Sequence, residues 1–148
     1  MEQGERRVGC AGWSIPREAA GAFPAGGSHL ERYAEVFNAV EINSSFYRPH
    51  REQRLQRFAA EVAGLGGKLG CVLVQLPPKF AYEDALAGGF FARLHGNPRI
   101  YYSSYEPDYL RQLRCDMATH AAAGRTAWTI FDNTAAGAAV PNALSLLA

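Results

Sequence analysis

The first side chains that could do chemistry lie in a segment that is otherwise typical of a buried strand. Side chains alternate between the two faces of a strand, so Glu41 and Asn43 share one face and Val40 and Ile42 share the other. A carboxylate and an amide cost free energy to bury unless partners hydrogen-bond them. The carboxylate of Glu41 is therefore a candidate general base, metal ligand or acceptor for substrate hydroxyls.

The structural alternative for Glu41 is an ion pair with Arg93 or Arg48, because structural ion pairs also bury carboxylates. His95 lies two residues after Arg93 and would act as an acid, a base or a metal ligand at a strand end. If the segment 83–95 is instead helical, Arg93 and His95 are both surface groups. We predict Glu41 and His95 as the catalytic residues.

Arginine and tyrosine residues supply a second kind of candidate site. Guanidinium groups beside aromatic rings suit phosphate oxygens and a stacked ring, as in nucleotides or single-stranded nucleic acid, although the same residue types dominate protein interfaces. Trp13 is a candidate for stacking on a sugar or base, or else a lid on the core. The predicted ligand-binding residues are Trp13, Asn43, Ser45, Tyr47, Arg48, Gln75, Arg93, Tyr102, Tyr105, Asp132 and Asn133.

The elements that must position these residues alternate along the chain. Strands are predicted over 7–11, 38–43, 71–76 and 126–131, and the segment 83–95 is open between helix and strand. Helices are predicted over 28–37, over 55–63 and from Pro107 to 123. A capping box formed by Ser28 and Glu31 opens the first of them. This order predicts an α/β domain with a largely parallel sheet. Ligands bind at the carboxyl ends of such strands, and the polar clusters follow them.

Composition sets broad limits on the function. A chain of 148 residues, 48% of them hydrophobic, predicts one globular domain. A net charge of +1 is too small for the protein as a whole to attract nucleic acid or anionic membranes. Three scattered cysteines and the lack of a long apolar run predict a cytoplasmic protein with no membrane contact. Four histidines without ligand spacing, and no nucleotide-binding glycine motif, predict neither a metal nor another cofactor.

Six stretches carry motifs that occur together in a known family, and they are Val8 to Ser14, Phe37 to Pro49, Leu69 to Phe80, Arg93 to Gly96, Tyr101 to Tyr105 and Phe131 to Asn142. In these stretches the chain resembles the DUF72 family, also called YecE-like, whose members are (β/α)-barrel proteins of uncharacterised function. The resemblance implies a TIM-barrel-like fold in which the segments near 51–56 and 87–95 are shortened, leaving about five strands in one domain over 1–148. An open barrel edge would favour oligomers.

Two functions fit these residues. The first is an enzyme acting on a phosphorylated or sugar-containing substrate or on a nucleic-acid phosphodiester, with Glu41 and His95 moving protons. The arginines would hold the anion, and amide side chains would orient the ligand. The second is a ligand-binding or protein-interaction domain without catalysis, with a small-molecule, nucleotide-like or nucleic-acid partner. The sequence leaves open whether the chain is an enzyme.

Overall fold

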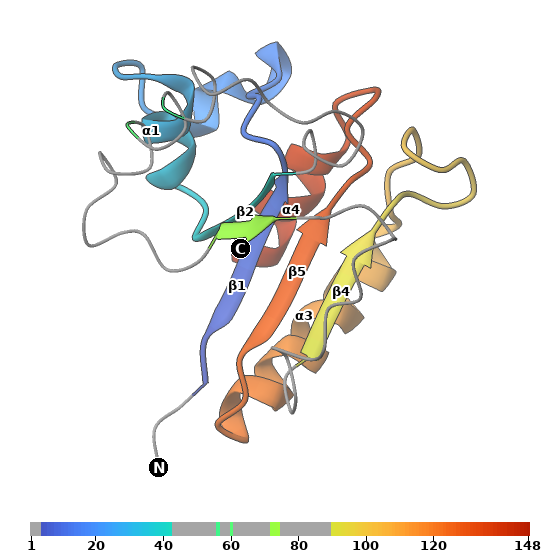
Figure 1. Ribbon diagram of the computed structural model, residues 1–148. Helices are drawn as coiled ribbons and strands as arrows, with labels where there is room; N and C mark the ends of the chain where they lie inside the picture. Colours follow the sequence, from blue (N-terminus) through green and yellow to red (C-terminus); the bar gives the residue numbers. More distant parts are fainter. Residues whose placement is uncertain (1–3, 43–55, 57–59, 61–71, 75–89) are drawn as a thin grey trace.

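The computed structural model describes residues 4–42, 56, 60, 72–74 and 90–148, and these residues form a parallel sheet with helices (Figure 1). Every strand pair in the sheet is parallel, as the sequence predicts. Four strands have four to six residues and one has three. They are β1 (Arg6–Ala11), β2 (Ala39–Ile42), the short β3 (Val72–Val74), β4 (Phe90–Leu94) and β5 (Ala127–Phe131).

The strand order is β3-β2-β1-β5-β4. This is the cyclic order of a parallel barrel that is open between β3 and β4, because the last strand of the chain pairs with the first. The architecture is thus that of an incomplete TIM-barrel-like fold, in agreement with the predicted fold class. The predicted shortening near 87–95 would fall between β3 and β4, but residues 75–89 and 43–55 are outside the described residues.

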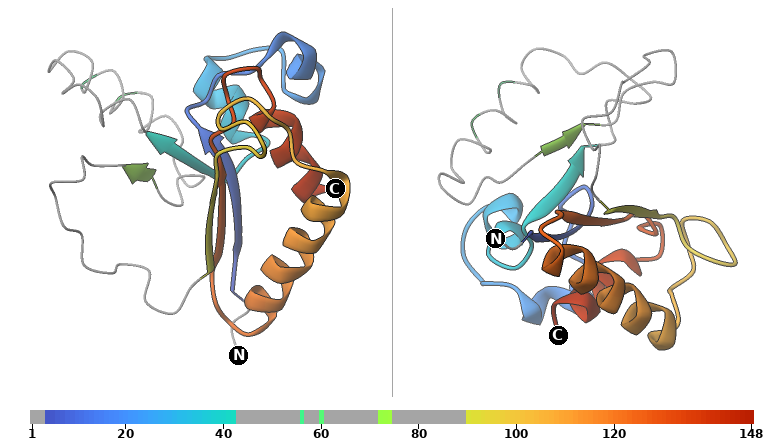
Figure 2. Two further views of the ribbon diagram at one scale, coloured as in Figure 1. Left: turned by 90° about the vertical axis from the view of Figure 1, so that its right-hand side faces the viewer. Right: turned by 90° about the horizontal axis from the view of Figure 1, so that it is seen from below.

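Helices α3 (Pro107–Ala122) and α4 (Ala139–Leu147) cover one face of the sheet (Figure 2). The prediction of α3 is confirmed, with Pro107 at the first turn, where its missing N–H removes no helical hydrogen bond. Helix α4 and the 3₁₀ helix η1 (Arg17–Ala22) were not among the helices predicted from the sequence. The predicted helix over 55–63 lies outside the described residues apart from two isolated positions.

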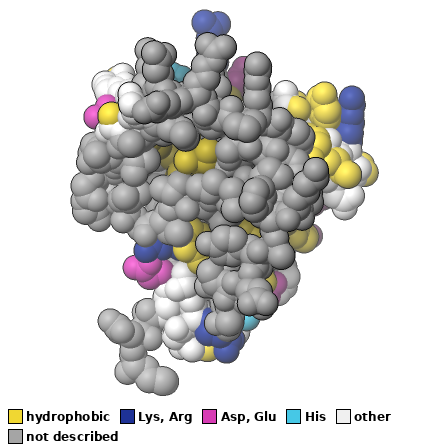
Figure 3. Space-filling view, viewed as in Figure 1, with side chains coloured by type: hydrophobic (Ala, Val, Ile, Leu, Met, Phe, Trp, Pro, Cys, Tyr) yellow, Lys and Arg dark blue, Asp and Glu magenta, His cyan; other side chains and the backbone are white. Residues whose placement is uncertain are grey.

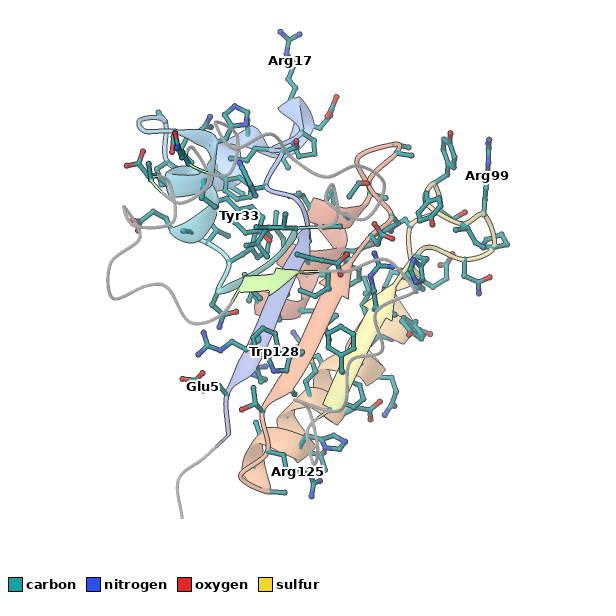
Figure 4. All side chains as sticks on the ribbon, viewed as in Figure 1. Glu5, Arg17, Tyr33, Arg99, Arg125 and Trp128 are labelled. Carbon is teal, nitrogen blue, oxygen red and sulfur yellow. The ribbon has the colours of Figure 1, made fainter. Side chains whose placement is uncertain are left out.

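Helix α1 (His29–Ala34) begins with the predicted capping box. The Ser28 side chain accepts a hydrogen bond from the Glu31 N–H, and the Glu31 carboxylate accepts one from the Ser28 N–H. These bonds lower the pKa of Glu31. The helix brings Tyr33 to the sheet (Figure 4), where its hydroxyl accepts from the Cys10 N–H and donates to the Ala39 carbonyl. Tyr33 therefore joins β1 to β2.

The core lies between the sheet and α3 and α4. Strand alternation sends Val8 and Cys10 of β1, Val40 of β2 and Phe131 of β5 to this face, and all four are buried there. They pack with the buried stripe of α3, which is Leu110, Leu113 and Met117, and with Val140, Ala143 and Leu146 of α4.

The opposite face carries the alternate residues of each strand. Glu41, Ile130 and Arg93 belong to this face because their neighbours Val40, Phe131 and Leu94 lie in the core. On this face the central strand β1 carries Arg7 near its start and then Gly9 and Ala11 toward its carboxyl end. Gly9 and Ala11 have no side chain beyond Cβ. Long side chains from flanking strands therefore have room to meet above β1.

Candidate functional site

Glu41 and Arg93 form a bidentate ion pair on the face of the sheet opposite the helices. Arg93 donates from Nε to Glu41 Oε2 over 2.8 Å and from Nη2 to Oε1 over 2.6 Å. The Glu41 side chain is 1% exposed and that of Arg93 is 20% exposed. The hydrogen bonds to Glu41 raise the pKa of Arg93, against the opposing effect of burial. The structural ion pair that the sequence left open for Glu41 is thus present.

The fold places these two residues on strands that are not neighbours. Glu41 is on β2 and Arg93 is on β4, with β1 and β5 between them in the sheet. Neighbouring strands lie about 4.8 Å apart, so the two backbones are separated by three such intervals. Strand alternation puts both side chains on the same face, and Gly9 and Ala11 leave room for them above β1. Ile130 of β5 lies on the same face, next to Arg93 in the register of the strands.

His95 and Asp132 form a second contact at the carboxyl ends of β4 and β5. The paired residues Leu94 and Phe131 are the last of their strands, so the next residue of each strand lies at the same edge. His95 Nδ1 is 2.9 Å from Asp132 Oδ2. Asp132 is buried, whereas the His95 side chain is 40% exposed. An imidazole held by a buried carboxylate and open to solvent can exchange protons with a bound ligand.

Arg93 connects the two contacts into one cluster. Its Nη2 is 3.2 Å from Asp132 Oδ2, and its Nη1 is 3.1 Å from both ring nitrogens of His95. All three guanidinium nitrogens therefore have protein partners, which favours a supporting role for Arg93 over the predicted capture of a substrate anion. The cluster holds two carboxylates and one guanidinium, so with a neutral His95 its net charge is −1.

Asn133 follows Asp132 and belongs to a buried network of amide side chains that contacts the loop after β4. Its Nδ2 donates to the Ser103 carbonyl and to Asn142 Oδ1, each over 2.9 Å. Asn142 Oδ1 also accepts from the Tyr105 N–H, and its Nδ2 donates to Ser104 Oγ. Asn133 Oδ1 is buried and has no hydrogen-bond partner among the described residues. The network ties the loop after β4 to β5 and α4.

The aromatic candidates divide between core and surface. Tyr105 is partly buried against the core and its hydroxyl accepts from the Gly96 N–H, so its main contacts are structural. Trp13 also packs partly against the core, as its structural alternative predicted. Tyr102 is 45% exposed and lies beside Arg99, whose guanidinium is 4.0 Å from the ring centre.

The structure thus brings Glu41, Arg93, His95, Asp132 and Asn133 to one end of the sheet, at the carboxyl ends of its strands. Their predicted catalytic and binding roles stay predictions. The remaining predicted site residues lie outside the described residues, and they are Asn43, Ser45, Tyr47, Arg48 and Gln75. Sequence reasoning missed Asn142 and Ser103, because an Asn after proline and a Ser in a loop are ordinary turn residues.

Within the described residues, no group of three or more His, Cys, Asp or Glu side chains is arranged to hold a metal ion. His95 and Asp132 contact each other, but Glu41 is engaged by Arg93 at both oxygens.

A parallel sheet in cyclic barrel order, with polar side chains at the carboxyl ends of its strands, defines an incomplete (β/α)-barrel protein. The family model described as a protein of unknown function, DUF72, matches residues 7–63. The resemblance proposed from the motifs is confirmed over that segment. No curated protein and no solved structure matches the chain. Among the helices in the described part of the chain, none is long and apolar enough to span a bilayer.

Proposed function

We propose that the protein is an acid–base enzyme in which His95 exchanges a proton with a phosphorylated or sugar-containing substrate or with a nucleic-acid phosphodiester. The contact between His95 and the buried carboxylate of Asp132 is the observation that carries the proposal. When the neutral imidazole donates its Nδ1–H to Asp132, Nε2 is the remaining acceptor. Nε2 then accepts from Arg93 or from a substrate that replaces that contact.

The other members of the cluster support this proton transfer. The carboxylate of Asp132 favours one orientation and one tautomer of the imidazole, as in other acid–base pairs. Glu41 keeps Arg93 in place, and Arg93 in turn contacts both His95 and Asp132. Glu41 and Arg93 therefore act as positioning residues in this proposal, and Glu41 no longer serves as the first candidate base.

The experiment is a turnover assay with wild type and His95→Gln. The panel contains p-nitrophenyl phosphate, bis(p-nitrophenyl) phosphate, p-nitrophenyl glycosides and a labelled single-stranded oligonucleotide. General acid–base catalysis contributes about 100-fold or more, so His95→Gln should lose at least that factor on any substrate that the wild type converts. His29→Gln, at an exposed position of α1, is the matched control and should keep full turnover. Equal turnover in His95→Gln would refute the proposal.

A ligand-binding domain without catalysis is the second candidate. The observation that favours it is the engagement of both Glu41 oxygens by Arg93, which removes one of the two predicted catalytic groups from direct contact with a substrate. If the wild type converts none of the panel but binds one of its members, and if His95→Gln weakens that binding, this second function is supported.

A further inference from the structure

The loop after β4 exposes three large apolar side chains in succession. Ile100 is 60% exposed, Tyr101 is 44% exposed and Tyr102 is 45% exposed. The space-filling view shows hydrophobic and basic side chains gathered at the edge of the molecule where this loop projects (Figure 3). Contiguous exposed apolar side chains are typical of binding sites.

This loop is held in one shape by its own hydrogen bonds. The Arg99 N–H donates to Ser103 Oγ, the Ser103 N–H donates to the Arg99 carbonyl, and the Ala135 N–H donates to the Tyr101 carbonyl. The Tyr101 N–H donates to the carbonyl of His95. A binding surface whose backbone is already ordered loses less entropy when a ligand binds.

Arg99 gives the loop a positive charge. Its guanidinium carbon is 4.0 Å from the centre of the Tyr102 ring, and Figure 4 shows the side chain pointing away from the sheet. Among the described residues, no carboxylate lies within ion-pair distance of Arg99. An exposed arginine beside an aromatic face, with no acidic partner there, complements a phosphate next to a flat ring.

The loop also adjoins the cluster of His95 and Asp132. The rings of His95 and Tyr101 meet edge to face with their centres 6.0 Å apart. A ligand that stacks on this loop would therefore have its adjacent groups near the exposed imidazole. We propose that the loop 97–102 is a platform for single-stranded nucleic acid, on which an unpaired base stacks against Tyr102 or Tyr101 while Arg99 contacts a neighbouring phosphate.

Single-stranded nucleic acid fits this platform better than a protein partner does. Aromatic side chains and arginine serve both kinds of ligand, but a protein partner would have to place an acidic side chain opposite Arg99. A nucleic acid strand supplies a phosphate beside every base, and an unpaired base offers the open ring face that a duplex hides. The inference deepens the proposed function, on which it rests for the reaction, by naming a phosphodiester strand as the substrate.

Binding of a fluorescein-labelled single-stranded dT oligonucleotide, measured by fluorescence anisotropy at low salt, tests the platform. Loss of one stacked base lowers affinity by roughly 5-fold or more, so Tyr102→Ala should show that loss. Arg99→Gln should weaken binding by a similar factor. It should also reduce the slope of log affinity against log salt concentration by about 0.7, the value for one phosphate of a single strand. Arg111→Gln, an exposed arginine paired with Asp108, and Tyr109→Ala, on α3, should bind as the wild type does.

The proposal is overturned if the wild type does not bind the oligonucleotide, if Tyr102→Ala and Arg99→Gln bind as tightly as wild type, or if a duplex of equal length binds as well. The proposal is also overturned if the wild type self-associates but does not bind the oligonucleotide, and if this self-association disappears in Tyr102→Ala. That result would assign the loop to a contact between protein chains. Failure of the proposed function looks different: the oligonucleotide would still bind through Tyr102 and Arg99, while His95→Gln would leave turnover unchanged.

Discussion

Arg93 and Glu41 are 52 positions apart in the chain and join in a bidentate ion pair across the two strands that separate β2 from β4. The pair lies on the face of the sheet opposite α3 and α4. Burial of two charges stabilises a fold only when each charge has its partner. The pair also fixes the guanidinium that contacts His95 and Asp132.

The first prediction concerns this ion pair. Glu41→Gln should lower the free energy of unfolding by about 3 kcal/mol, because removal of one partner leaves a buried charge without full compensation. Arg93→Gln should destabilise the protein as well, and the double variant should cost less than the two single variants combined. Urea denaturation of all four proteins measures this coupling.

Asp108→Asn is the matched control for the ion pair. Asp108 and Arg111 form an exposed pair on α3, and such pairs contribute little, so its stability should change by less than about 0.5 kcal/mol. Additive effects of Glu41→Gln and Arg93→Gln in the double variant would contradict a direct coupling between the two side chains.

The second prediction concerns the close approach of β1 and β2. A Cβ added at Gly9 would lie 1.9 Å from the Ala39 carbonyl oxygen and 2.8 Å from the Tyr33 hydroxyl, so the strands must move apart to accept it. Gly9→Ala should therefore destabilise the protein by about 3 kcal/mol in urea denaturation. Gly21→Ala adds a Cβ with nothing within 4 Å and should leave stability within about 1 kcal/mol of wild type. Equal stability of the two variants would contradict this close packing of the two strands.

The sequence predicted those helices and strands whose start or pattern depends only on nearby residues. The structure confirms the strands predicted over 7–11 and 126–131, the capping box of Ser28 and the helix opened by Pro107, each of which depends on neighbours in sequence. The segment 90–94 could not be assigned because a short apolar run fits a helix and a strand equally. Its pairing with β5 makes it a strand. Helix α4 was missed, since its N-cap residue Ala138 makes no side-chain hydrogen bond and gives no start signal.

The candidate site was predictable as a set of residues but not as a set of contacts. The positions of Glu41, His95 and Asp132 at strand ends, together with their polar side chains, indicate them from the sequence alone. The strand order decides which of them touch, and no local pattern in the sequence contains that order. The pairing of Leu94 with Phe131 places His95 beside Asp132, and the small residues of β1 let Arg93 reach Glu41.

The third prediction concerns the cysteines and the alkaline limit of stability. Burial raises the pKa of the Cys10 thiol from 9.0 to about 12, although a hydrogen bond with Tyr33 opposes the shift. Because the folded pKa is the higher one, this thiol contributes stability that is complete below pH 9.0 and is lost as the pH rises toward about 12. Cys10→Ala should therefore lose stability less steeply than wild type across this range in urea denaturation.

Thiol labelling provides an independent check on Cys10. At pH 8, iodoacetamide should modify the exposed Cys115 first and Cys10 only after unfolding, because the thiolate is the reactive form. Mass spectrometry of the peptides measures both rates. Equal labelling of Cys10 and Cys115 in the folded protein would contradict the burial of Cys10 beneath Tyr33.

The last prediction concerns Asn142, which joins α4 to the loop after β4. Its Oδ1 accepts from the Tyr105 N–H and from Asn133 Nδ2, and its Nδ2 donates to Ser104 Oγ. Asn142→Ala leaves the Tyr105 N–H without this acceptor, so the free energy of unfolding should fall by about 2 kcal/mol. Hydrogen exchange should speed up most at Tyr105, because the loss is local to the loop. Ser145→Ala, an exposed position on the same helix, should leave the exchange of Tyr105 unchanged. A uniform increase in exchange rates across the sheet and helices of Asn142→Ala would mean that the network supports global stability without specifically holding the loop. In that case the folded variant should bind the oligonucleotide with the affinity of the wild type.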